Sequence, residues 1–251
     1  MPRMMFTKKN RVNKTEDDVG FLEIKNTSDN AASLYIYGDI VSDSWGKWSE
    51  EDTCPKDIAE FLAGIDDDAD LTVYLNSGGG DVYAGIGIHS ILQRHKGHVK
   101  GVVDGIAASI ASVILMACDE IEVSNGAQIM IHKPLTYGWG NADDFRDVIE
   151  HLDRCQEMIT DIYMAKAKDG VSREDIEAAI NAETWMSGVE AAEKFEIQTV
   201  DTEPVAACTG GMLNRYKKVP EKLDTVTVQD LKKTEEQEKK EILKDLFLFG
   251  M

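Results

Sequence analysis

The stretch from Asp104 to Met116 constrains the fold of this chain more than any other. Residues 99–103 predict a buried strand, Gly105 a turn, and residues 107–117 a helix too apolar to lie outside a core. Ser109 therefore falls at a strand-to-helix elbow. Backbone N–H groups at a helix start lack intrahelical partners, so a serine there suits a nucleophile whose attack creates an oxyanion. The alternative is that Ser109 only caps the helix.

The composition excludes several classes of partner. The chain has 251 residues and a formal net charge of −19, which argues against a phosphate-backbone ligand. Its four cysteines form no C-x-x-C pair, which indicates a reducing compartment, and no apolar run reaches the length of a membrane span. We expect a soluble, cytoplasmic protein that binds neither nucleic acid nor membrane and needs no metal or other cofactor.

The apolar pattern repeats a unit of strand, strand and helix, which predicts an α/β fold. The main domain is expected at residues 21–202, after a flexible N-terminal arm at 1–20 and before a linker and charged amphipathic helix at 203–251. The expected strands are 34–38, 71–75, 99–103, 119–123 and 128–132, and the expected helices are 55–65, 82–94, 107–117, 141–168, 172–180 and 187–195.

The long helix at 141–168 carries more apolar side chains than one face of a monomer usually buries, which predicts a subunit contact. The 172–180 and 187–195 helices each open on a serine followed three residues later by a carboxylate, a capping signature.

A catalytic serine needs a base and donors for the oxyanion. His132 closes the strand at 128–131, where it would stand at a sheet rim, although a structural histidine is the alternative. The glycine run 78–80 follows another strand and would let backbone approach a ligand closely. No Lys-Ser/Thr follows it, so a nucleotide-binding P-loop is not expected.

Three blocks in order, Leu75–Gly80, Gly105–Ala111 and Ile129–Pro134, resemble the signature blocks of the Clp-type caseinolytic proteases, the ClpP family. The resemblance covers roughly residues 35–201. It implies a ClpP/crotonase-like spiral of strand-strand-helix units with the long helix as a handle. It also implies Ser109 as nucleophile, His132 as general base, and the N–H groups of Gly80 and Ile110 as the oxyanion hole.

The third member of the triad departs from the family pattern. Where the family usually carries an aspartate, this chain has Glu183. Glutamate orients the histidine in some hydrolases, but its extra methylene requires a shifted backbone. The alternative is an exposed loop carboxylate, with Asp175 or Asp169 as the acid.

The resemblance implies a serine endopeptidase inside a ring-shaped homo-oligomer of stacked rings, with residues 138–140 as the ring-to-ring contact. The N-terminal arm, the 38–45 and 183–185 blocks and the C-terminal helix look most similar to ClpP-related phage head maturation proteases, which implies capsid or scaffold substrates. Three alternatives stay open: an ATP-dependent Clp proteolytic subunit, a crotonase-type acyl-CoA enzyme, and an inactive assembly component.

The ATP-dependent members of the family bind an unfoldase through an apolar surface pocket. Tyr74 matches one of its aromatic residues, but two other positions fall on Thr72 and Arg94. Burying an unpaired arginine under an apolar docking loop would cost several kcal/mol. We therefore expect weak binding of Clp ATPases and proteolysis without ATP.

Overall fold

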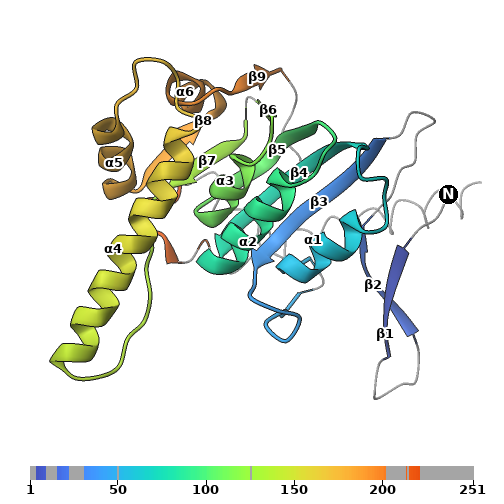
Figure 1. Ribbon diagram of the computed structural model, residues 1–251, viewed down its shortest axis with the longest axis horizontal. Coiled ribbons are helices and arrows are strands. Elements are labelled where there is room, and N and C mark those ends of the chain that lie inside the picture. The colour runs from blue at the N-terminus through green and yellow to red at the C-terminus, as the bar shows by residue number, and fades with distance from the viewer. Residues whose placement is uncertain are drawn as a thin grey trace, which may run out of the picture. The chain divides into compact units, whose positions relative to one another are not determined.

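The structure is a computed structural model that describes residues 4–9, 16–22, 31–49, 51–124, 126–201, 213 and 215–220 (Figure 1). The chain divides into two compact units, Met1–Lys218 and Val219–Met251. The first unit runs past residue 202, the expected end of the main domain. The charged helix expected near the C-terminus lies outside the described residues.

The first unit is built on a seven-stranded, mostly parallel sheet. Five strands follow one another in the order β3-β4-β5-β6-β9, with β7 beside β5 and β8 antiparallel to β7. Alternation of buried and half-buried residues along β3 marks a sheet with one face in the core. The strands are β3 (Ala31–Ile40), β4 (Asp70–Gly80), β5 (Val99–Ala108), β6 (Glu120–Ser124), β7 (Gln128–Ile131), β8 (Thr184–Ser187) and β9 (Gln198–Val200).

Strand β5 pairs with β4 on one edge and with two successive strands on its other edge. Its residues 100–103 pair with β6, and its residues 106–108 pair with β7. The change of partner falls at Gly105, where the sequence predicts a turn. The end of β5 is thereby placed against β7 rather than β6.

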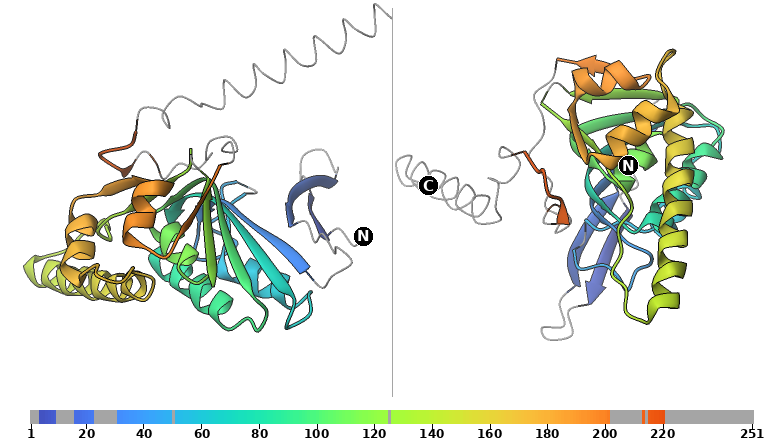
Figure 2. Two further views of the ribbon diagram at one scale, coloured as in Figure 1. Left: turned by 90° about the horizontal axis from the view of Figure 1, so that it is seen from above. Right: turned by 90° about the vertical axis from the view of Figure 1, so that its left-hand side faces the viewer.

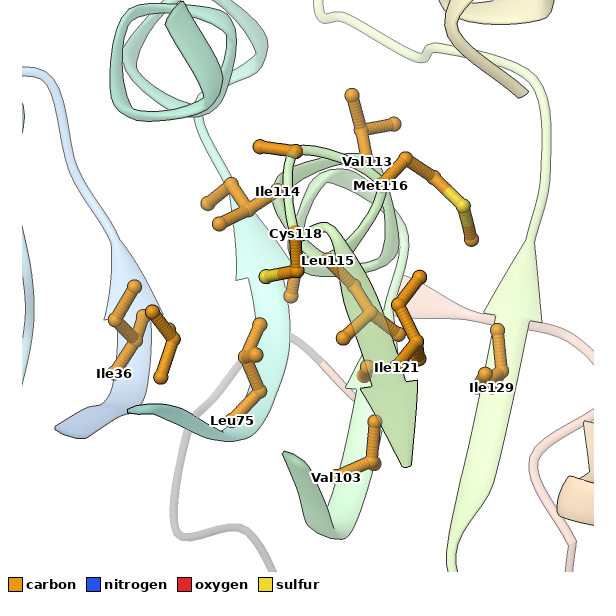
Figure 3. Close-up of a cluster of buried hydrophobic side chains, with 14 of the residues drawn as sticks. Ile36, Leu75, Val103, Val113, Ile114, Leu115, Met116, Cys118, Ile121 and Ile129 are labelled. Atoms are coloured by element: carbon orange, nitrogen blue, oxygen red, sulfur yellow. The ribbon is translucent and has the colours of Figure 1, made fainter. Parts of the chain in front are cut away.

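Three helices, α1 (Pro55–Leu62), α2 (Val82–Gln93) and α3 (Ile110–Leu115), lie on one face of the sheet (Figures 1 and 2). All six residues of α3 are buried. Figure 3 shows Ile114 and Leu115 above Leu75 and Val103 of the sheet. A helix this apolar is stable only inside a core, as its sequence predicts.

The other helices are α4 (Ala142–Met164), α5 (Arg173–Asn181) and α6 (Gly188–Lys194). Their N-cap residues, Asn141, Ser172 and Ser187, each form a capping box, which confirms the two serine caps expected from the sequence. Figure 1 shows the N-terminal half of α4 extending away from the sheet.

The structure differs from the expected elements at several points. Strand β4 continues through the glycine run, because residues up to Gly80 pair with β3. Residues 107–108, expected in a helix, belong to β5, and the short strands β8 and β9 were not expected. Two strands, β1 (Met4–Lys9) and β2 (Glu16–Leu22), form an antiparallel pair that begins within the expected N-terminal arm and ends two residues beyond it. No helix among the described residues is long and apolar enough to cross a membrane.

Candidate active site

Ser109 occupies a strained elbow between β5 and α3. Its φ of 55° and ψ of −126° are unusual for a residue with a side chain. Such strain costs of order 1–3 kcal/mol and persists only where the surroundings enforce it. Here the Ser109 N–H donates to the carbonyl of Met130 at 2.8 Å, and the buried helix α3 holds the other side. The elbow predicted from the sequence is therefore present, with the side chain of Ser109 outside the helix.

The register of β5 and β7 brings His132 to Ser109. Ala108 pairs with Met130 in parallel, so the residues that follow each strand lie at the same edge of the sheet. Ser109 Oγ lies 2.7 Å from His132 Nε2, within hydrogen-bond distance. An oriented serine–imidazole pair is the arrangement that activates a serine for nucleophilic attack.

The environment of His132 favours its neutral form. Burial lowers the pKa of the imidazole, because charge is costly away from water, and the nearby Glu183 carboxylate partly opposes this by raising the pKa. A neutral imidazole accepts a proton, as a general base must.

The glycine run lies directly against Ser109. A Cβ built on Gly79 would lie 2.9 Å from Ser109 Cβ and 2.7 Å from the Ala108 carbonyl oxygen. A Cβ on Gly80 would lie 1.9 Å from the Ile40 carbonyl oxygen, so any side chain there would displace backbone. Ile110 opens α3, so its N–H has no acceptor within the helix. The glycine run and the start of α3 therefore both lie beside Ser109.

Glu183 lies opposite His132 by strand register. In the antiparallel β7–β8 pair Ile131 faces Thr184. His132 follows Ile131 and Glu183 precedes Thr184, so the same register places these two residues opposite each other. Glu183 has a φ of 51°, in the left-handed region that a residue with a side chain rarely adopts. Among the described residues, no hydrogen bond joins His132 to a carboxylate. The Glu183 Oε1 atom instead accepts the backbone N–H groups of Lys217 and Lys218, each at 2.7 Å.

The two fallback acids lie elsewhere. The carboxylate of Asp175 accepts the Ser172 hydroxyl at 2.8 Å as part of the α5 cap, and it is exposed. Asp169 is also exposed, in the connection before α5. Of the three carboxylates considered from the sequence, Glu183 alone is close enough to His132 to influence its pKa.

Ser112, one turn into α3, has a structural environment. Its fully buried hydroxyl lies 2.6 Å from the Ser109 carbonyl oxygen and 2.7 Å from the Tyr163 hydroxyl. These contacts stabilise the backbone at Ser109, and the Ser112 hydroxyl is inaccessible to solvent. No cluster of potential metal ligands occurs among the described residues.

Sequence reasoning missed Tyr216 and Trp185. The Tyr216 ring forms T-shaped pairs with His132, with centroids 5.0 Å apart, and with Trp185, with centroids 6.1 Å apart. Tyr216 stands in a segment whose loose composition predicted a linker. The aromatic side chain of Tyr216 in this segment was the sequence feature that could have indicated a buried residue.

Comparisons with known proteins identify relatives of this chain. A family model of the Clp proteases matches residues 50–202. The proteolytic subunit of an ATP-dependent Clp protease from Bacteroides fragilis is 31% identical over 142 residues, which are 56% of this chain and 68% of that protein. Proteolytic subunit 1 from Prochlorococcus marinus subsp. pastoris is 32% identical over 165 residues, 64% of this chain and 83% of that protein. The subunit from Porphyromonas gingivalis is 33% identical over 135 residues, 53% of this chain and 60% of that protein.

The mixed α/β architecture with its parallel sheet fits these relatives. The ClpP/crotonase-like fold expected from the three sequence blocks is confirmed.

Proposed function

Because the chain belongs to the Clp protease family, we propose that it is a serine endopeptidase with Ser109 as its nucleophile. The observation that carries this proposal is the 2.7 Å separation of Ser109 Oγ and His132 Nε2 at a strained strand-to-helix elbow. A crotonase-type acyl-CoA enzyme is not favoured, because the family match is to proteases and a serine–histidine pair has no necessary part in thioester binding.

The proposed reaction follows from the site. His132 accepts the hydroxyl proton as Ser109 Oγ attacks a peptide carbonyl, and it then delivers that proton to the leaving amine. The acyl-enzyme is hydrolysed by a water that His132 deprotonates in turn. The N–H groups of Gly80 and Ile110 stabilise the oxyanion in both steps. The glycine run supports this role, because it lets the backbone lie against the serine.

Glu183 is the proposed acid of the triad. Its position opposite His132 across the β7–β8 pair and its effect on the pKa of the imidazole support the assignment. In this role the carboxylate stabilises the imidazolium that forms when His132 accepts a proton.

The proposed working form is a ring-shaped homo-oligomer, and the exposed surface of α4 is the structural feature that supports it. Phe145 and Ile149 of this helix are 45% and 58% exposed, and Trp139 before it is fully exposed. Exposed large apolar side chains are clustered on α4 and on the segment that precedes it. Such a cluster is typical of a protein–protein contact rather than a solvated surface. We propose that this surface joins subunits, with residues 138–140 at the contact between rings.

The proposed substrates are capsid or scaffold proteins of a phage particle, and the proposed mode is ATP-independent. The relatives are named as subunits of ATP-dependent proteases. In this chain the sheet face opposite the helices carries hydroxyl and charged side chains beside the stacked pair Tyr35 and Tyr74. Thr72 pairs in register with Lys100, whose Nζ lies 2.7 Å from the Glu122 carboxylate. Covering this ion pair with an apolar loop would remove charges from water at a cost of several kcal/mol.

A direct test is hydrolysis of a fluorogenic peptide library and of casein by the purified protein without nucleotide. We expect cleavage by the wild type and none by Ser109→Ala, which removes one hydroxyl and leaves the elbow in place. Equal cleavage by both proteins would refute the proposal. Co-expression with candidate capsid and scaffold chains then tests the substrate class, since specific cleavage products should appear only with the active protein.

A further inference from the structure

Residues 215–218, here called the strap and drawn in red in Figure 1, contact His132, Gly78 and Glu183 of the candidate active site. The strap belongs to the same compact unit as the sheet. Its Tyr216 side chain is buried, 9% exposed, although the three residues around it at 215, 217 and 218 are exposed. A single buried aromatic residue in an otherwise exposed segment is an anchor.

Tyr216 occupies the space beside the nucleophile. Its ring forms T-shaped pairs with His132 and Trp185, and its hydroxyl donates to the carbonyl of Gly78. A Cβ built on Gly79 would lie 3.2 Å from the Tyr216 hydroxyl and 2.9 Å from Ser109 Cβ. The Tyr216 side chain and Ser109 therefore face the same glycine, where a bound peptide must lie for its carbonyl to reach the serine.

The backbone of the strap also engages the proposed triad acid. The N–H groups of Lys217 and Lys218 both donate to Glu183 Oε1, and Lys218 Nζ donates to the Ala182 carbonyl at 2.5 Å. Two hydrogen bonds to one carboxylate oxygen hold that carboxylate toward the strap. In this arrangement Glu183 makes no hydrogen bond to His132, although strand register places the two residues opposite each other.

We infer that the strap is an intramolecular inhibitor of the proposed protease: Tyr216 fills the place of a substrate side chain next to Ser109, and the following backbone withdraws Glu183 from His132. This inference rests on the proposed function. It also defines the substrate class for that subsite, a polypeptide with an aromatic side chain placed against Trp185 and the glycine run. Release of the strap opens the subsite and frees the Glu183 carboxylate in one movement.

The strap competes with substrates at the high effective concentration of a tethered segment, so inhibition needs no great intrinsic affinity. If the strap is closed nine-tenths of the time, its removal raises the rate of reaction at Ser109 about tenfold. This increase is the quantity to measure.

The test compares the rates of fluorophosphonate labelling and of peptide hydrolysis for the full-length wild type, Tyr216→Ala, Tyr216→Phe and Arg215→Ala. Tyr216→Ala should react several-fold faster than the wild type. Tyr216→Phe, which keeps the ring and loses the hydrogen bond to Gly78, should show a smaller increase. Arg215→Ala is the matched control, because it alters an exposed side chain of the same strap, and its rates should equal those of the wild type.

A synthetic peptide spanning residues 213–218 gives an independent measurement. Added to Tyr216→Ala, it should raise KM for a small peptide substrate without changing kcat, and the same peptide with alanine for tyrosine should be inactive. This outcome also shows that Tyr216→Ala is folded, because an unfolded site cannot be inhibited competitively.

Two failures are distinguishable. If Ser109→Ala abolishes labelling but Tyr216→Ala labels no faster than the wild type, or is not inhibited by the peptide, the inhibitory strap is wrong and the protease remains. If Ser109→Ala labels as fast as the wild type, the proposed function itself is wrong, and the inference falls with it.

Discussion

Ser109 Oγ and His132 Nε2 lie 2.7 Å apart, although 23 positions separate the two residues in the chain. The parallel pairing of Ala108 with Met130 produces this contact, because each of the two residues follows its strand at the same edge of the sheet. Strand register fixes the backbone positions of both residues, so these positions do not depend on the two side chains themselves. Substitutions at the site should therefore alter chemistry more than folding.

Ser109→Ala should abolish fluorophosphonate labelling and lower peptidase activity by about a thousandfold or more, because it removes the hydroxyl that we propose forms the acyl-enzyme. Ser112→Ala is the matched control. Its buried hydroxyl contacts Tyr163 and the Ser109 carbonyl, so its loss should reduce stability and leave labelling intact. Labelling that persists in Ser109→Ala and disappears in Ser112→Ala would reverse the assignment.

The pH dependence of kcat/KM should show an acid limb below the ordinary imidazole pKa of 6.5. Burial lowers the pKa of His132, and the base acts in its neutral form, so activity is present above this lowered pKa and lost as the pH falls through it. The measurement is kcat/KM for a peptide from acid to alkaline pH. A profile without an acid limb would rule out His132 as the base.

Glu183→Gln should lower turnover by about a hundredfold or more, since an amide cannot stabilise the imidazolium. The acid limb should also move to lower pH, because the Glu183 charge raises the pKa of His132 and the substitution removes that charge. Asp175→Asn is the control, because Asp175 serves the α5 cap. Full activity of Glu183→Gln together with loss in Asp175→Asn would show that the acid has been misassigned.

Light scattering at micromolar concentration should report a closed oligomer rather than a monomer. Ile149→Asp should weaken the assembly, because it places a charge on the exposed apolar surface of α4. Asp147→Asn, on the same helix and exposed, should leave the oligomer unchanged. A monomeric wild type would contradict the proposed ring.

A Clp ATPase with ATP and a tagged unfolded substrate should not stimulate degradation by this protein. Thr72 pairs with Lys100 on a face that carries the Lys100–Glu122 ion pair, and the exposed Arg94 stands at the end of α2. These groups replace the apolar contacts that a docking loop would need. Robust ATP-dependent degradation would show that a usable docking pocket exists.

Much of the candidate site could be predicted from the order of residues. The apolar run that contains α3 is too long and too uniform for a surface helix, so the sequence predicts that α3 lies in the core. The valines and the glycine that precede this run predict that Ser109 lies at a strand-to-helix elbow. The glycine run could be read as a close approach of backbone, because only glycine tolerates a neighbouring atom where Cβ would stand. These are local properties, so the local sequence determines them.

The tertiary structure decided the rest. On one edge β5 pairs first with β6 and then with β7, and this choice of partners depends on contacts between segments far apart in the chain. Short strands such as β8 and β9 have too few residues for a hydrophobic pattern to identify them from sequence. Tyr216 packs against His132, and the Lys217 and Lys218 amides donate to Glu183. These contacts join residues more than thirty positions apart, so they form only when the chain folds back to the site. Sequence patterns report which side chains prefer burial, whereas only the folded chain determines which distant backbone groups meet them.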